Sequence, residues 1–299
     1  MLRFSGHDTF HCKEQWLLKG FQKIDNQGYK AGFGSDSALV DLGVGKNMVR
    51  AISHWMKSFD IINEENILTP FANDVFGANG FDPYLENQGT LWLLQYKLCS
   101  KNYASIYGLL FCDYFLEKAT LEFSEGQIVS YITRKLQESN ERIVTETTLV
   151  ADLKVLLKTY ITPKRGDKMN EKTLEDDFSA PLQSLNLIIP LERRAETNEK
   201  IYQINRKDIQ RGLSVEIFGF CLLIEFQEGD VINLDRLKGT LGAFFCLTNE
   251  GLLDAIQGLT EAYSEFVFKE DGGIRQLQIK VENKIELGKK LLTTHYERK

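Results

Sequence analysis

The stretch Ser37-Ala-Leu-Val-Asp-Leu-Gly-Val-Gly-Lys-Asn-Met-Val-Arg-Ala-Ile-Ser-His-Trp-Met-Lys-Ser58 predicts a short helix, a tight turn and a longer helix. Gly43 and Gly45 mark the turn, because glycine takes backbone conformations that end a helix. After Lys46, apolar residues recur at the i, i+3, i+4 and i+7 spacing of one buried helix face. That face carries Met48, Val49, Ile52, Trp55, Met56 and Phe59, and the other carries mostly Lys46, Asn47, Arg50, Ser53, His54 and Lys57.

Two short β-like runs follow the longer helix. Residues 59–62 and 67–69 flank a polar tip at 63–66. Helix, turn, helix and hairpin is the order of a winged helix–turn–helix, whose second helix enters the DNA major groove while the preceding turn lies near phosphate. In this interpretation Lys46 and Arg50 contact phosphate, and Asn47 reads a base edge. A helical hairpin with no DNA role fits the same pattern.

The middle of the chain repeats part of this pattern. Residues 127–138 and 147–160 predict helices, and residues 174–185 predict a third after a charged loop at 163–168. Residues 187–192 and 200–204 then predict a hairpin with a long polar tip, which has the shape of a wing. Arg193, Arg194 and Lys200 lie where a wing touches phosphate, and a solvated loop explains them equally well.

From Val231 onward the chain reads as mostly helical, with its clearest helix over 249–266 and a terminal hairpin over 266–268 and 274–281. No repeat of fixed period is visible.

We predict a mainly α fold with small β-hairpins, in the α+β class. It divides into an N-terminal winged-helix DNA-binding region (1–125), a second winged-helix-like region (126–212) and a C-terminal helical region (213–299).

Composition excludes several classes of protein. The chain has 299 residues, 43% of them apolar and 11% aromatic, which is enough for a large core. A net charge of −6 rules out a histone-like polycation, and the hydrophobicity disfavours disorder. Residues 1–60 nevertheless hold eight Lys and Arg against six Asp and Glu. Because contacts to a DNA backbone depend on a local patch, this mildly basic head remains compatible with nucleic acid binding.

The expected location is the cytoplasm, with no membrane partner. Residues 1–6 lack the apolar core of a secretory signal, and the longest apolar run, 217–224, is too short for a bilayer span of about 20 residues. The five cysteines are scattered and form no Cys-x-x-Cys pair, so reduced thiols are expected in place of a disulfide framework or structural zinc.

Gly43-Val-Gly45-Lys46 resembles part of a phosphate-binding loop. The full Walker pattern needs a glycine where Val40 stands and a Ser or Thr where Asn47 stands. Because that hydroxyl holds magnesium, an ATPase is excluded. The remaining feature is a glycine turn before a helix N-terminus, which favours any phosphate, including that of DNA.

The run Gly6-His-Asp-Thr-Phe-His-Cys12 concentrates reactive side chains near the N-terminus. His7 and His11 with Cys12 or Asp8 have zinc-ligand chemistry, although no distal partner is evident. His7 also suits a general base, and a structural role bonded to backbone is the alternative. Glu282-Asn-Lys284 after Asp271 mimics a nuclease signature that is common by chance. By themselves the residues indicate a DNA-binding scaffold and no reaction, so we assign no metal site.

Three segments together resemble a known family. They are Phe4-Ser-Gly-His-Asp-Thr-Phe10 with Trp16-Leu-Leu-Lys-Gly20, then Leu42-Gly-Val-Gly-Lys-Asn-Met-Val-Arg-Ala-Ile-Ser-His-Trp55, and then Asp82-Pro-Tyr-Leu-Glu86 with Thr90-Leu-Trp-Leu-Leu94. These residues are similar to the SspB-type family of DNA phosphorothioation systems, formerly a domain of unknown function (number four thousand and seven). The resemblance spans nearly the whole chain and is most specific in its first hundred residues.

The resemblance implies a part in replacing a DNA backbone oxygen by sulfur. Family members are DNA-nicking components that work beside a cysteine desulfurase, an ATP-pyrophosphatase and an ATPase. The family motif reads Gly-His-Glu-Thr-Phe with an arginine three residues later, and here Asp8 and Lys13 stand at the two variable positions. Both replacements keep the charge, but a shorter carboxylate and a point-like ammonium change any bidentate geometry.

We therefore predict a double-stranded-DNA-binding component of a phosphorothioate modification and defence system, with nicking as an associated activity. His7 and Asp8 are the candidates for assisting phosphodiester cleavage, and a divalent metal ion is expected only if nicking is real. A non-catalytic adaptor or transcription regulator is the main alternative, and a purely structural interaction protein is a third. The predicted DNA-binding residues are Arg3, Lys13, Lys19, Lys46, Asn47, Arg50 and Lys57.

Overall fold

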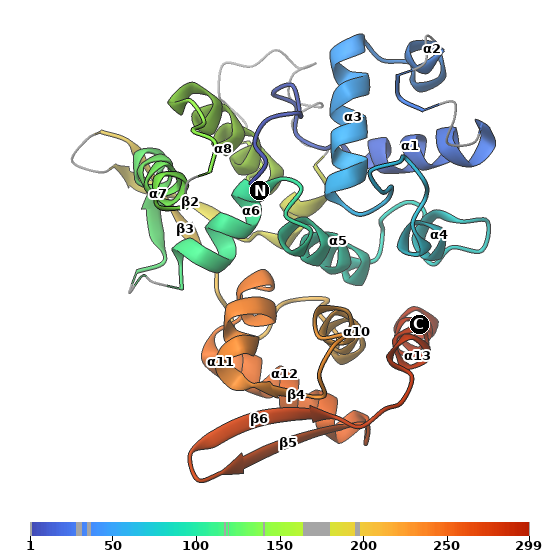
Figure 1. Ribbon diagram of the computed structural model, residues 1–299, viewed down its shortest axis with the longest axis vertical. Helices are drawn as coiled ribbons and strands as arrows, with labels where there is room; N and C mark the ends of the chain where they lie inside the picture. The colour runs from blue at the N-terminus through green and yellow to red at the C-terminus, as the bar shows by residue number, and fades with distance from the viewer. Residues whose placement is uncertain are drawn as a thin grey trace.

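The computed structural model describes residues 2–27, 32–34, 37–116, 118, 120–139, 141–163, 180–194 and 198–298. These residues form mainly helices with two small antiparallel sheets of three strands each, which confirms the predicted α+β class. Figure 1 shows α1 to α8 with the first sheet in one half of the molecule, and α10 to α13 with the second sheet in the other. A single cluster of buried apolar side chains includes residues of both halves.

The N-terminal region confirms the predicted pair of helices and the turn between them. Gly43 ends the first helix at φ 65°, and Gly45 immediately precedes the second. The apolar face of that second helix is buried as expected, and α1 packs against it. The region consists of α1 (Glu14–Gln27), α2 (Ala38–Leu42), α3 (Lys46–Ser58), α4 (Pro70–Phe76) and α5 (Gln88–Ser100).

The hairpin expected after α3 is shorter than predicted. It consists of one bridge between Ile62 and Leu68. The Asn63 side chain accepts hydrogen bonds from the N–H groups of Glu65 and Ile67, which closes the loop within a few residues. Helix α4 then begins at Pro70, which has no N–H to donate to a ladder. The two runs therefore separate after a single pair.

The middle region contains the first sheet. Strand β3 pairs antiparallel with both β1 and β2, so the order is β1-β3-β2. The predicted helices over 127–138 and 147–160 and the predicted hairpin are confirmed. The described part of the segment 174–185 is a 3-10 helix, Pro181–Leu185, and residues 164–179 lie outside the described residues. The other elements are α6 (Ser105–Gly108), a π-helical turn (Leu109–Tyr114), β1 (Glu122–Ser124), α7 (Glu125–Glu138), α8 (Glu146–Tyr160), β2 (Ile188–Arg194) and β3 (Lys200–Ile204).

The C-terminal region follows the same order of elements. A helix, a three-residue strand, two helical segments and a hairpin succeed one another, and the first strand again pairs with the last, giving β4-β6-β5. The predicted hairpin is confirmed, whereas the helix predicted over 249–266 ends at Ala262. The elements are α10 (Val215–Glu225), β4 (Val231–Asn233), α11 (Leu234–Leu237), a π-helical turn (Lys238–Gly242), α12 (Asn249–Ala262), β5 (Phe266–Asp271), β6 (Ile274–Ile279) and α13 (Lys284–Glu297).

Helix α13 joins the C-terminal region to the loop before α5. The Asp82 carboxylate is buried there and accepts from the N–H groups of Glu86 and Asn87 and from the Thr90 hydroxyl. Tyr296 of α13 hydrogen-bonds the same hydroxyl at 2.7 Å. Through Asp82 and Thr90, the segments 82–86 and 90–94 therefore contribute a contact between the two halves of the molecule. Across the described part of the chain, no helix is both long and apolar enough to cross a membrane.

Candidate functional site

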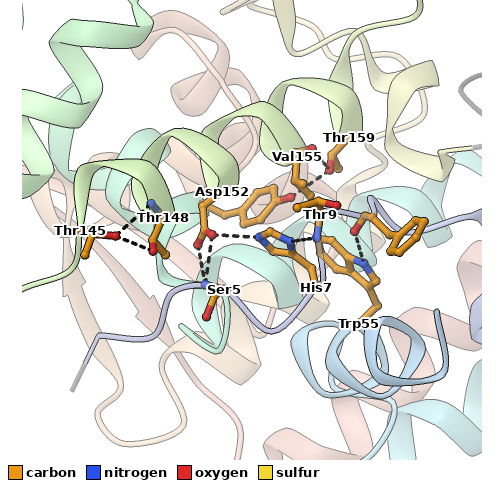
Figure 2. Close-up of polar contacts among 11 residues, drawn as sticks. Ser5, His7, Thr9, Trp55, Thr145, Thr148, Asp152, Val155 and Thr159 are labelled. Atoms are coloured by element: carbon orange, nitrogen blue, oxygen red, sulfur yellow. Dashed lines mark hydrogen bonds and ion pairs between the residues drawn. The ribbon is translucent and has the colours of Figure 1, made fainter. Parts of the chain in front are cut away.

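The Ser5–Thr9 turn lies between α3 and α8 and brings together the reactive N-terminal side chains. Figure 2 shows Ser5 and His7 facing Asp152 of α8, with Thr9 next to His7 and Trp55 of α3 on the other side. The turn is attached to α3 because the Trp55 indole donates to the Phe10 carbonyl at 3.0 Å. The N-terminal segment therefore bridges two helices that are far apart in sequence.

The backbone of this turn is unusual. Ser5, Asp8 and Thr9 have φ values of 65°, 46° and 65°, in the left-handed region that costs a non-glycine residue about 1–3 kcal/mol. Gly6 is also left-handed, at φ 93°, and a Cβ there would lie 2.8 Å from Nδ1 of His54. Only glycine fits this position. Such a cluster of strained residues persists when surrounding contacts hold it, and it is typical of functional sites.

Asp152 supplies the main contact that holds the turn. Its two carboxylate oxygens accept from the Ser5 N–H at 3.1 and 2.8 Å, and one of them lies 3.0 Å from His7 Nε2. The Thr9 N–H donates to His7 Nδ1 at 3.1 Å, so Nε2 carries the proton of the neutral ring and donates to Asp152 (Figure 2). Both His7 nitrogens are engaged, and the side chains of His7 and Asp152 are buried. This arrangement matches the structural role for His7.

Asp8 points from the turn to the exposed face of α3. Its carboxylate accepts from Arg50 Nε at 2.8 Å, and a second nitrogen of Arg50 donates to the Asn47 side-chain oxygen at 2.9 Å. An exposed ion pair of this kind adds only about 0–1 kcal/mol of stability. Its main consequence is to orient Arg50 and Asn47 beside Lys46, and all three side chains are exposed to solvent.

The other predicted DNA-binding cations do not join this group. Arg3 pairs with Glu64 at 2.6 Å, and Lys57 donates to the Glu64 carbonyl at 3.1 Å. Lys13 lies over the Trp16 ring just before α1, and Lys19 is exposed on α1. The structure places His7 and Asp8 in one turn, and Asp8 connects that turn to Arg50 and Asn47 beside Lys46.

His54 is buried, which corrects its placement on the solvent face of the helix. Its ring packs edge-on against His7 and Trp55, because the N-terminal segment covers the side of α3 that the sequence pattern left exposed. Burial, together with the nearby positive charge of Arg3, lowers the pKa of His54 to about 3. The ring is therefore neutral near pH 7, and its Nε2 has no hydrogen-bond partner within the described residues.

Two cavities lie beside the turn. One, of about 480 Å³, is lined by residues 2–6, His54, Tyr103, residues 142–145 and Thr148. The other, of about 370 Å³, is lined by Thr9 and one face of α8 that includes the exposed Lys154 and Lys158. The strained turn thus forms part of the wall of both cavities.

The described residues do not fit a protein cage for a metal ion. No three of their His, Cys, Asp and Glu side chains converge with the spacing that a metal needs. Both His7 nitrogens are engaged, and burial raises the pKa of the Cys12 thiol, which disfavours the thiolate that zinc requires. We therefore derive no chemical step through a metal.

Asp152 and the burial of His54 were missed from the sequence. A signal for Asp152 exists, because it stands between Leu149 and Leu153 in the apolar face of the helix predicted over 147–160. A buried carboxylate needs hydrogen-bond donors, so an acid on such a face indicates a partner elsewhere in the chain. The sequence contains no signal for which segment supplies that partner.

His54 makes the stability of the protein depend on pH. In the unfolded chain His54 has its ordinary pKa near 6.5 and binds a proton that the folded protein excludes until about pH 3. The free energy of unfolding therefore falls as pH decreases from 6.5 toward 3. In His54→Gln we expect this fall to be shallower, by up to about 1.4 kcal/mol per pH unit. Urea unfolding at pH 7, 6 and 5 measures both slopes, and equal slopes would contradict the assignment.

Comparison with known proteins places the chain in a family. Two crystal structures of SspB have this fold. One, with magnesium bound, has 25% identity and a TM-score of 0.81, and the other has 24% identity and a TM-score of 0.79. Each alignment covers 98% of this chain and 88% of the other. No curated protein matches. The family model described as a protein of unknown function, DUF4007, matches residues 4–296, and the chain therefore belongs to the DUF4007 family.

Proposed function

We propose that this protein is a double-stranded-DNA-binding component of a phosphorothioate DNA modification system. Membership of the DUF4007 family, the SspB fold and the motifs that resemble the SspB-type family support this role. Its proposed partners are the cysteine desulfurase, ATP-pyrophosphatase and ATPase of such a system. The cytoplasm, where these partners and the DNA meet, is the proposed location.

The observation that carries the proposal is the set of exposed side chains at the start of α3. Lys46, Asn47 and Arg50 follow the glycine turn directly, on the second helix of a helix–turn–helix. A helix N-terminus attracts phosphate, and the two cations add to that attraction. The Asn47 oxygen accepts from Arg50, which leaves its amide N–H groups to donate to a base edge.

Helix α8 extends this surface on the other side of the turn. Its exposed Lys154 and Lys158 line the same cavity as Thr9, next to the residue that holds Arg50. The middle and C-terminal regions share one order of helices and strands, and a winged helix in the middle region is part of this proposal. In this proposal duplex DNA contacts α3 and α8 together, with the Ser5–Thr9 turn between them.

Nicking is a second candidate function. It is favoured by the magnesium ion bound in the SspB relative and by the resemblance to DNA-nicking proteins. The engagement of both His7 nitrogens favours the alternative, an adaptor that binds DNA without cutting it. In either case we assign His7 to positioning the turn, and Asp8 to holding Arg50.

DNA binding is tested by Lys46→Ala with Arg50→Ala. Each cation that contacts phosphate contributes about one to the slope of log affinity against log salt. We therefore expect weaker duplex binding and a slope smaller by about 2 in the double variant. Fluorescence anisotropy with a labelled duplex at 50, 100 and 200 mM salt measures both quantities.

The matched control is Lys289→Ala with Lys290→Ala, which removes two exposed charges from α13 in the other half of the molecule (Figure 1). This control is expected to bind like the unaltered protein. If the two double variants behave alike, net charge explains the effect and α3 is not the DNA-binding element.

Nicking is tested with supercoiled plasmid in MgCl2. If the second candidate holds, purified protein produces open circular DNA, EDTA stops the reaction, and His7→Ala loses it because the turn is released. Asp152→Asn, which weakens the same turn from α8, is expected to reduce the rate as well. Full activity in His7→Ala would show that the turn plays no part in cleavage. If no buffer yields open circular DNA, the adaptor role is the one that stands.

A further inference from the structure

We propose that the 480 Å³ cavity beside the Ser5–Thr9 turn binds one nucleotide, with the base inside and the phosphate at the mouth. The proposal deepens the proposed function and rests on it where the nucleotide belongs to a DNA strand. The cavity's size, its partly apolar lining and the two arginines in that lining carry the inference.

The size of the cavity suits a base and its sugar. Sites for small organic ligands have volumes of about 300–1,000 Å³ and are mainly apolar with a few polar groups. This cavity has Leu2, Phe4, Ile143 and Val144 in its lining together with the Tyr103 ring. An inorganic anion alone would leave most of that volume and all of its apolar lining unused.

The His54 ring forms part of the cavity wall. It is 7% exposed, and its Nε2 is sealed from the cavity by the surrounding atoms. The ring is neutral near pH 7, so this part of the wall carries no charge and suits an uncharged base.

The mouth of the cavity suits a phosphate. Arg142 is exposed there, and Arg3 lies 4.6 Å above the Tyr103 ring with half of its side chain exposed. Helix α8 begins at the same rim, where Thr145 caps its first turn. Guanidinium groups and a helix N-terminus both favour phosphate oxygens, and the phosphate would compete with Glu64 for Arg3.

The position of the cavity connects it with the DNA-binding surface. Ser5 and Gly6 form part of its wall, and the same turn holds Arg50 through Asp8. A base extruded from a duplex on α3 would therefore enter beside the turn, as in enzymes that remove a base from the stack before acting on it. A free nucleotide presents the same base and phosphate. The test distinguishes it from a base that belongs to DNA.

The direct test is isothermal titration calorimetry with each of the four deoxynucleoside monophosphates and with inorganic phosphate. We expect at least one nucleotide to bind, and phosphate to bind at least ten-fold more weakly. Arg142→Ala removes an exposed cation from the lining and is expected to weaken nucleotide binding ten-fold or more. The control Arg134→Ala removes an exposed arginine from α7 and is expected to change nothing.

A duplex with 2-aminopurine at successive positions identifies the source. A fluorescence rise on binding that is lost in Arg142→Ala assigns the cavity to a base of DNA. Nucleotide binding without that rise assigns it to a free nucleotide.

Two results would overturn the proposal: no nucleotide binds, or inorganic phosphate binds as tightly as the nucleotides. Failure of the proposed function is distinguishable from both. In that case the unaltered protein would not bind duplex DNA. Titration with the monophosphates would still measure nucleotide binding in the cavity.

Discussion

The carboxylate of Asp152 is the contact on which the candidate site depends. A buried carboxylate is costly unless hydrogen-bond donors surround it, and here the donors come from Ser5 and His7, at the other end of the sequence. These bonds offset the strain of the left-handed residues in the turn. Each residue of Ser5-Gly-His-Asp-Thr9 then has a physical reason. Gly6 makes room for His54, His7 links Asp152 to the Thr9 backbone, and Asp8 holds Arg50.

The turn couples two helices that would otherwise be independent. Helix α3 contacts it through Trp55 and Arg50, and α8 contacts it through Asp152. One segment of five residues therefore sets the position of the exposed α3 side chains relative to the lysines of α8. The same segment lines two cavities that are open to solvent, so the exposed α3 side chains and both cavity walls depend on one hydrogen-bonded unit.

Local sequence patterns predicted the helices and hairpins. They did not predict the features that depend on packing between residues far apart in the sequence. The helices over 37–42 and 46–58 followed from apolar period and from the glycines, and the exposure of Lys46, Asn47 and Arg50 followed with them. His54 was misplaced because the segment that covers it lies nearly fifty positions away. The His7–Asp152 contact spans 145 positions, which no periodicity reveals. The first strand of each sheet in chain order, β1 or β4, has only three residues, too few for a sequence pattern, and the repeated topology is therefore visible only in the structure.

The central claim is that Asp152 acts on the DNA-binding face through the turn and Arg50. A double-mutant cycle of Asp152→Asn and Arg50→Ala, read as the free energy of duplex binding, tests it most directly. If Asp152 acts through Arg50, Asp152→Asn weakens binding in the unaltered protein but has little further effect in Arg50→Ala. The account predicts a coupling energy of about 1 kcal/mol or more. Effects that add to within about 0.3–0.5 kcal/mol would contradict it.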